Sequence, residues 1–232
     1  MERGLIGWVD AFLRAQLEDG WVQGPVPSPD KPFILYRLHA CILLWLENHE
    51  TFMDVVEVDF SKMLLRPCIV VSTVSMKGVS NAAPFSFNSP ATTKPPMYGF
   101  CCEVEHDTWR NIRANDEFVV NLVDMRFGEL MEPLSRDLPY EVSEITEFGL
   151  TELPSKTVKP PRIGEAYGWM ECRMTSYEQL SPRAVWIFGE VLCSEIKRDA
   201  LDGVVDVENV KPLNHISGEI FVVEMKRTRY RR

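Results

Sequence analysis

Residues 67–87, PCIVVSTVSMKGVSNAAPFSF, decide the fold because they hold two apolar runs separated by a turn. Residues 67–74 are rich in Val and Ile and predict a strand, and residues 79–87 predict the strand that returns antiparallel to it. SMKG, residues 75–78, predicts the turn, in which Gly78 supplies a positive φ. The hairpin indicates a mainly β domain.

The rest of the chain after residue 53 continues this pattern of short apolar runs and turn residues. Helices are expected only at 107–115, with Asp107 or Thr108 as its cap, and in short pieces near 126–135 and 143–148. No strand-helix-strand alternation recurs, so a closed antiparallel barrel is favoured over a doubly wound parallel sheet. The further strands are expected at 96–102, 117–123, 169–180, 184–196 and 219–225.

The first 52 residues differ from this domain and predict an N-terminal extension, with residues 53–232 as the barrel domain. Residues 5–17 place apolar side chains at helical spacing, and residues 33–46 predict a second, buried or docking helix that is shorter than the ~20 residues a bilayer requires. Residues 24–32 contain four prolines and predict a linker. Because Met53 would itself make a sensible amino terminus, the extension is either appended or an over-long start.

Composition narrows the classes of partner. The 232 residues carry a formal charge of −9, which argues against nucleic acid as a partner, although residues 226–232 form a basic tail that either contacts an anion or is simply solvated. The six cysteines form no C-x-x-C pair and have no His at metal-ligand spacing, so no zinc site is expected. No secretion signal or membrane span is recognised, and a cytoplasmic protein with reduced thiols is predicted.

The usual catalytic motifs are missing from the sequence. It contains no G-x-G-x-x-G, no Walker loop, no H-E-x-x-H and no G-x-S-x-G, and its four histidines suggest no Ser/His/Asp triad. Nucleophilic hydrolysis therefore has no positive support.

The hairpin itself offers a pocket for a flat ring. Small side chains let a ligand approach the backbone, and Phe85 and Phe87 could wall a heteroaromatic ring. The alternative is structural: Pro84 also fits a bulge or an edge strand, and both phenylalanines fit a core. The polar groups available to a ring belong to Ser72, Thr73, Ser75, Asn81, Ser86 and Asn88.

A second stretch, EHDTWRNI at 105–112, has the outline of a phosphate site at the first turn of a helix. Unpaired N–H groups and the helix dipole favour an anion there, with the Thr108 hydroxyl as donor and His106 or Arg110 as the charge. A capped helix with an exposed Arg explains the same residues. Together, a ring pocket and a phosphate site indicate flavin mononucleotide, FMN.

Longer blocks of the sequence resemble the flavin reductase-like family with an FMN-binding split barrel. These blocks are RPCIVVSTVSMKGVSNAAPFSFNSPATTKPPMYGF, HDTWRNIRANDEFVVNLV, GLTELPSKTVKPPRI, and ECRM followed by FGEVL, and they run in the family's order over about residues 60–225. The resemblance implies a six-stranded antiparallel Greek-key split barrel with short peripheral helices, and a homodimer with FMN near the subunit interface.

The resemblance also implies the cofactor-binding residues. His106 stands where the family commonly has Lys, Asn88 stands where many members have a second Phe, and His215, in LNHISGEIF, matches a block near the flavin. The residues expected to line or bind the ring are Asn81, Ala82, Ser86, Phe87 and Asn88, with Thr73, Val74 and Ser75 on the preceding strand. The residues expected near the phosphate are His106, Thr108, Arg110 and Asn111.

Hydride transfer between a nicotinamide and a flavin needs orientation more than an acid or base, which fits the missing catalytic motifs. The leading hypothesis is an NAD(P)H-dependent FMN reductase without catalytic side chains of its own. One alternative is an FMN-bound electron carrier that receives electrons from a protein partner, as flavoredoxin-like or ferric-reductase-like members do. The other is a non-catalytic ligand-binding barrel.

Overall fold

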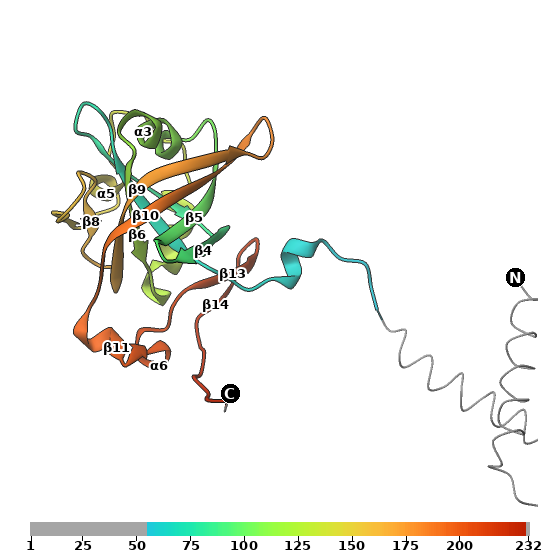
Figure 1. Cartoon of the computed structure of the whole chain (residues 1–232). Helices are drawn as coiled ribbons and strands as arrows, with labels where there is room; N and C mark the ends of the chain where they lie inside the picture. Colours follow the sequence, from blue (N-terminus) through green and yellow to red (C-terminus); the bar gives the residue numbers. More distant parts are fainter. Residues whose placement is uncertain (1–54, 231–232) are drawn as a thin grey trace, which may run out of the picture. The chain divides into compact units, whose positions relative to one another are not determined.

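The computed structural model describes residues 55–230, which are built mainly of antiparallel strands with a few short helices (Figure 1). This confirms the predicted fold class. The predicted N-terminal extension, including its two helices and the linker at 24–32, lies outside the described residues. Its structure and the domain boundary at residue 53 stay predictions.

Seven strand segments form the main sheet in the order β3-β2-β6-β9-β10-β5-β4, with every neighbouring pair antiparallel. Their bounds are Ile69–Val74 (β2), Ser80–Phe85 (β3), Asn88–Thr93 (β4), Pro96–Glu103 (β5), Glu117–Leu122 (β6), Gly168–Gln179 (β9) and Ala184–Ile196 (β10). The predicted hairpin is confirmed, because β2 pairs with β3 and Gly78 has a φ of 83° in the turn between them.

The two outermost segments of this sheet, β3 and β4, are consecutive in the chain and separated only by Ser86 and Phe87. The Phe87 carbonyl accepts a bond of 2.8 Å from Cys101 N–H, so the ladder to β5 begins within the corner itself. Residues 80–93 therefore act as one bent strand that pairs with β2 by its first half and with β5 by its second. Counted this way the sheet is the predicted six-stranded barrel, and the order β6-β2-β3/β4-β5 is a Greek key.

The barrel interior is apolar. Phe100 contacts Phe85 and Phe118, with ring centroids 4.9 and 5.4 Å apart, and all three rings are buried. Helix α3 (Asp107–Asn115) closes one end, because its Trp109 and Ile112 join the same core. Figure 1 shows α3 lying across that end of the barrel.

A second core lies on the outer side of β2 and β3. Val70 and Ala82 pack there against Phe127, Leu134 and Ile145. These last three residues come from the predicted helical stretches, which the structure resolves into η2 (Met125–Leu130), α4 (Met131–Leu134) and α5 (Glu144–Glu147). Strand β2 is buried on both faces for this reason.

Smaller elements surround the barrel. The strand predicted at 219–225 is shorter in the structure and does not join the barrel: β14 pairs with β13, which pairs with β1. None of the helices in the described residues is long and apolar enough to cross a membrane. The remaining bounds are Phe60–Met63 (η1), Arg66–Pro67 (β1), Glu152–Leu153 (β7), Arg162–Ile163 (β8), Arg198–Ala200 (η3), Leu201–Asp202 (β11), Val204–Val205 (β12), Val207–Val210 (α6), Asn214–Ser217 (β13) and Ile220–Val222 (β14).

The predicted cap of α3 is wrong. His106 occupies the cap position, and its side chain makes no capping bond. Asp107 is already the first helical residue and lies 4.0 Å from Arg110, while the Thr108 hydroxyl donates to Asn81 in β3. A tertiary contact thus takes the hydroxyl that sequence reasoning assigned to the helix end.

A buried ion pair fastens the loop at 154–163 to the barrel. The fully buried carboxylate of Glu171, in β9, pairs with Arg162 and accepts bonds of 2.8 and 2.6 Å from the backbone N–H groups of Lys156 and Thr157. Burial raises the pKa of Glu171, but a hydrogen bond from the Thr157 hydroxyl, together with those from the two backbone N–H groups and Arg162, outweighs burial and holds the pKa below its ordinary value. The carboxylate is therefore charged at neutral pH and keeps the loop in place.

We expect Gly189→Ala to destabilise the barrel. A Cβ at Gly189, in β10, would lie 2.5 Å from the buried ring of Phe118 and 3.2 Å from the Arg173 carbonyl, which leaves no room for a methyl group. Overpacking of this kind costs about 1–3 kcal/mol of unfolding free energy. Gly128→Ala is the matched control, because nothing lies within 4 Å of its Cβ position. Denaturant unfolding measures both, and equal losses would contradict the expected clash.

Candidate functional site

Two neighbouring hollows lie beside β3, and Pro84 and Ser135 line both. The small cavity has a volume of about 70 Å³, and the groove has a volume of about 740 Å³. The small cavity is also lined by Asn81, Ala83, His106, Asp107, Thr108, Leu134, Arg136, Asp137, Leu138 and Glu144. The groove is also lined by Cys68, Phe85, Ser86, Met125, Gly128, Glu129, Met131, Glu132, Leu213, His215, Gly218, Glu219, Phe221 and Val223.

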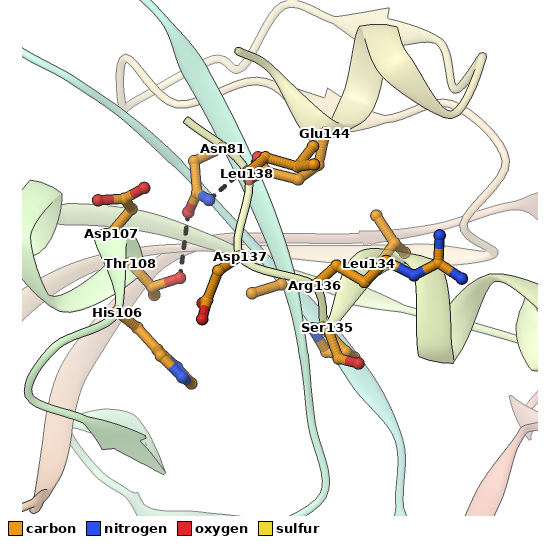
Figure 2. Close-up of a pocket in the computed structure, with 12 residues that line it drawn as sticks. Asn81, His106, Asp107, Thr108, Leu134, Ser135, Arg136, Asp137, Leu138 and Glu144 are labelled. Carbon is orange, nitrogen blue, oxygen red and sulfur yellow. Dashed lines mark hydrogen bonds between the residues drawn. The ribbon is translucent and has the colours of Figure 1, made fainter. Parts of the chain in front are cut away.

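Asn81 is the centre of a buried polar network at the small cavity. Its Oδ1 accepts from the hydroxyls of Thr73 (3.0 Å) and Thr108 (3.1 Å), and its Nδ2 donates to Glu144 Oε2 (3.1 Å). Figure 2 shows Asn81 held between Thr108 and Glu144. Because the amide is bonded at both ends, its orientation is fixed.

The same network extends to helix α3, and its hydrogen bonds all run in one direction from donor to acceptor. Tyr140 donates to Asn111 Oδ1 (2.7 Å), Asn111 Nδ2 donates to the Thr73 hydroxyl (3.0 Å), and Thr73 donates to Asn81. Each donor leads on toward the Glu144 carboxylate, which also accepts from Ala82 N–H (3.1 Å). Glu144 is thus the final acceptor of the network.

Glu144 is a buried residue, with 5% of its surface exposed, yet it has no cationic side chain within ion-pair distance among the described residues. Burial raises its pKa, while bonds from its own backbone N–H, Ala82 and Asn81 oppose that rise only in part. A proton therefore binds Glu144 more readily than an ordinary glutamate.

The start of α3 borders the small cavity. The first backbone bond of the helix runs from Arg110 N–H to His106 carbonyl (3.2 Å), so the N–H groups of Asp107 and Thr108 precede the helical ladder. His106 Nδ1 is buried and has no hydrogen-bond partner among the described residues. Both features suit an anion.

Acidic side chains also line the small cavity. Asp107, Asp137 and Glu144 line the small cavity, with His106 and Arg136 as the basic side chains. Burial raises the pKa of Asp107, the neighbouring Arg110 opposes this, and Asp137 adds to it. An anion entering the cavity therefore meets carboxylates as well as N–H donors.

The groove is mainly apolar. Phe85, Phe221 and Met131 contribute apolar side chains, and Ser86 and His215 contribute polar groups from facing elements. Ser86 Oγ lies 3.4 Å from His215 Nδ1, and the rings of His215 and Phe221 are 5.0 Å apart. A hollow of this size and lining is typical of small-molecule sites.

Arg66 stands behind this wall. Its Nη2 lies 3.2 Å from His215 Nδ1 and also donates to the Ile216 carbonyl, and its Cζ lies 4.6 Å from the centroid of the Phe87 ring. The pairing of β1 with β13 sets this position, because Arg66 is directly opposite His215.

The structure brings some of the predicted site residues together. Thr73, Asn81, Ala82, Thr108 and Asn111 meet around the small cavity through the Asn81 network. His106 lines the same cavity, and Ser86 and His215 line the groove. Their contacts with a ligand stay predictions.

Five other predicted residues are engaged elsewhere. Ser75 Oγ accepts from Val79 N–H within the hairpin turn, and the Val74 carbonyl accepts from Asn115. Asn88 donates to the Pro67 carbonyl and accepts from Tyr98. Arg110 stacks on Tyr140 at 3.6 Å and does not line the small cavity. Phe87 is 43% exposed at the corner and stacks on Arg66.

Sequence reasoning missed Glu144 and Arg66. Glu144 lies in a stretch predicted only as a short helix, and Arg66 precedes the first strand of the hairpin. Neither residue has a motif that would single it out, because each reaches the site only when distant segments pack together.

Comparison with known sequences identifies the domain. The family model described as "Flavin reductase like domain" matches residues 61–223. An uncharacterized protein of Halalkalibacterium halodurans is 35% identical over 167 residues, which cover 67% of this chain and 80% of that protein.

Solved structures agree with the fold. 2-Nitrobenzoate 2-nitroreductase of Pseudomonas fluorescens matches with a TM-score of 0.65 and 28% identity, over 72% of this chain and 84% of the other. Nitrilotriacetate monooxygenase component B of Bacillus cereus matches with a TM-score of 0.68 and 24% identity, over 76% and 95% of the two chains. The second likeness, at this identity, bears on the fold alone.

We expect Thr108→Val to lower the unfolding free energy by about 1 kcal/mol, because the fully buried hydroxyl donates to Asn81 and valine has the same shape without the donor. Thr175→Val is the control, since Thr175 is exposed in β9 and its hydroxyl makes only a 3.3 Å bond. Urea unfolding compares the two variants. A Thr108→Val protein as stable as the Thr175→Val protein would show that the Asn81 network does not stabilise the fold.

Proposed function

The chain belongs to the flavin reductase-like family, and on that premise we propose that it is an FMN-binding oxidoreductase that takes hydride from NAD(P)H. The observation that carries the proposal is the pair of adjoining hollows beside β3. One is large and mainly apolar, the other is small and bordered by a helix N-terminus, and Pro84 and Ser135 belong to both. FMN has a flat heteroaromatic ring joined by a ribityl chain to a phosphate, so its two ends match the two hollows.

The groove fits the ring in size and in chemistry. Its volume of about 740 Å³ is within the range of ligand sites, and aromatic and thioether side chains wall it. Ser86 and His215 supply the few polar groups that orient a heteroaromatic ring. Phe87 lies at the corner next to Ser86, where the bent strand turns from one sheet edge to the other.

The small cavity fits the phosphate in part. The N–H groups of Asp107 and Thr108 and the unpaired Nδ1 of His106 are the donors available to it. The Thr108 hydroxyl already donates to Asn81, so we propose that Thr108 contributes its backbone N–H. Asn111 acts through Thr73, and Arg110 through its charge near the helix start.

The bound FMN supplies the two-electron chemistry, which explains why the chain needs no nucleophile or acid-base pair. The groove's own contribution is to orient two flat rings and to exclude water from them. The polar side chains of the groove, Ser86 and His215, stabilise the negative charge that the ring gains on reduction.

We also propose that the protein is a homodimer. Residues 58–65 expose the large apolar side chains of Phe60, Met63 and Leu65, and helix η1 in this segment buries none of its residues. Exposed apolar clusters of this kind mark interaction surfaces. Light scattering on the full chain should give twice the monomer mass, and a monomer at micromolar concentration would contradict this.

The first test is an absorbance spectrum of the full chain after addition of FMN and desalting, followed by anaerobic mixing with NADH and with NADPH. We expect retained flavin bands, which bleach with at least one nicotinamide. Retention without bleaching by either would overturn the reductase and favour an electron carrier fed by a protein partner. No retention even from excess FMN would overturn FMN as a held cofactor and favour a barrel for another ligand.

The affinity for FMN should rise as the pH falls. The pKa values of Asp107 and Glu144 are raised in the free protein, and a bound phosphate repels their charged forms, so binding is coupled to proton uptake. We expect FMN to bind more tightly at acidic pH than at pH 8, because a carboxyl that takes up a proton no longer repels the phosphate. Fluorescence titration measures it.

Riboflavin, which lacks the phosphate, is the control ligand and should show a weaker pH dependence. Asp107→Asn should reduce the dependence for FMN because it removes one of the two titrating carboxyls. The same pH dependence for FMN and riboflavin would contradict a phosphate in the small cavity.

A further inference from the structure

Arg66 is a nearly buried cation without an acidic partner. The residue is 9% exposed, no described carboxylate lies within ion-pair distance of it, and its Nε is buried with no hydrogen-bond acceptor. Buried charges are normally paired, because a charged group that leaves water loses its hydration. An unpaired guanidinium beside a ligand-sized groove therefore suggests that its charge acts on what the groove binds.

Neutral groups hold the guanidinium in place. It donates to the Ile216 carbonyl, lies 3.2 Å from His215 Nδ1, and stacks over the Phe87 ring at 4.6 Å. None of these contacts cancels the charge. The strand pairing of Arg66 with His215 fixes the arrangement in the backbone.

Arg66 also fixes the proton on His215. A guanidinium can only donate, so His215 Nδ1 must accept, and the ring proton lies on Nε2, which is 3.0 Å from the Gly218 carbonyl and donates to it. The Ser86 hydroxyl lies 3.4 Å from the same Nδ1. Arg66 thus orients His215 in the groove wall.

Arg66 differs in charge from the charged side chains that line the groove, which are acidic. The described lining includes Glu129, Glu132 and Glu219 but no Lys or Arg, and Glu132 is paired with Arg136. Arg66, which contacts His215 in the groove wall, is therefore a positive charge directly behind this wall. In a buried environment with a lower dielectric than water, a charge acts across such a layer.

We propose that Arg66 is a positioning residue that makes the groove bind a reduced, negatively charged flavin ring more tightly than an oxidised one. A hydride carries one negative charge, so a ring that accepts it from NAD(P)H becomes more negative by one unit while the nicotinamide becomes a cation. The Arg66 charge favours that product and raises the midpoint potential of the bound cofactor. The inference rests on the proposed function, because it requires flavin in the groove.

The test is the midpoint potential of FMN on the full chain, measured by reductive titration against a reference dye, for the wild type and for Arg66→Met, Arg66→Lys and Arg183→Met. We expect Arg66→Met to lower the potential, through a loss of tenfold or more in the preference for reduced over oxidised FMN, which is about 30 mV for a two-electron couple. Arg66→Lys, which keeps the charge, should stay within about threefold of the wild type in this preference. Arg183→Met should leave the potential unchanged, because Arg183 is 79% exposed at a hairpin and pairs with Glu103.

A purely structural Arg66 predicts a different pattern. Lysine cannot reproduce the planar contacts with Phe87 and His215, so a structural role would lower the potential equally in Arg66→Met and Arg66→Lys. Equal shifts, or no shift in Arg66→Met, would overturn the proposal. If Arg66→Met does not fold, Arg66→Gln removes the charge with the same expected result.

The outcomes separate this inference from the proposed function. A wild-type protein that retains no FMN would overturn both. A wild-type protein that retains FMN, with an unchanged potential in Arg66→Met, would overturn the role of Arg66 alone.

Discussion

The structure depends on one bent strand, residues 80–93, which forms both edges of the main sheet. Because β3 and β4 are joined through Ser86 and Phe87, the two ends of the sheet belong to one continuous strand and the sheet closes on itself. Closure creates the apolar interior around Phe100 and Phe118. It also forces a corner at which the strand leaves one partner for another, and the groove opens at that corner. Fold and candidate site therefore have the same origin.

The two hollows beside this strand differ in their electrostatics. The small cavity contains carboxylates, a helix N-terminus and an imidazole nitrogen without a partner, so its charge depends on pH. The groove is apolar, and a guanidinium that cannot lose its proton stands behind its wall. One site thus combines a titratable end and an end of fixed charge. This division matches a ligand whose phosphate needs hydrogen-bond donors and whose flat ring needs an apolar wall.

The sequence was informative where structure is local. The runs at 67–74, 184–196 and 107–115 became β1 and β2, β10 and α3 with bounds close to those expected, because apolar periodicity and turn residues act over a few neighbours. The closed antiparallel barrel followed from the same patterns, and the strand count of six followed from the family resemblance. A strand was expected at 219–225 and is present as β14, but the pattern of the sequence does not reveal its partner, which is β13 and not a strand of the barrel.

By itself the sequence determined the hairpin, the fold class and several side chains of the candidate site, including Asn81, Ser86 and His106. Only the tertiary structure decided how those side chains are used. The Thr108 hydroxyl serves Asn81 instead of the helix end. Glu144 contacts Asn81 across 63 residues of the chain, and Arg66 contacts His215 across 149. Hydrogen-bond partners and unpaired charges depend on distances between such segments, and those distances are set by the closure of the barrel.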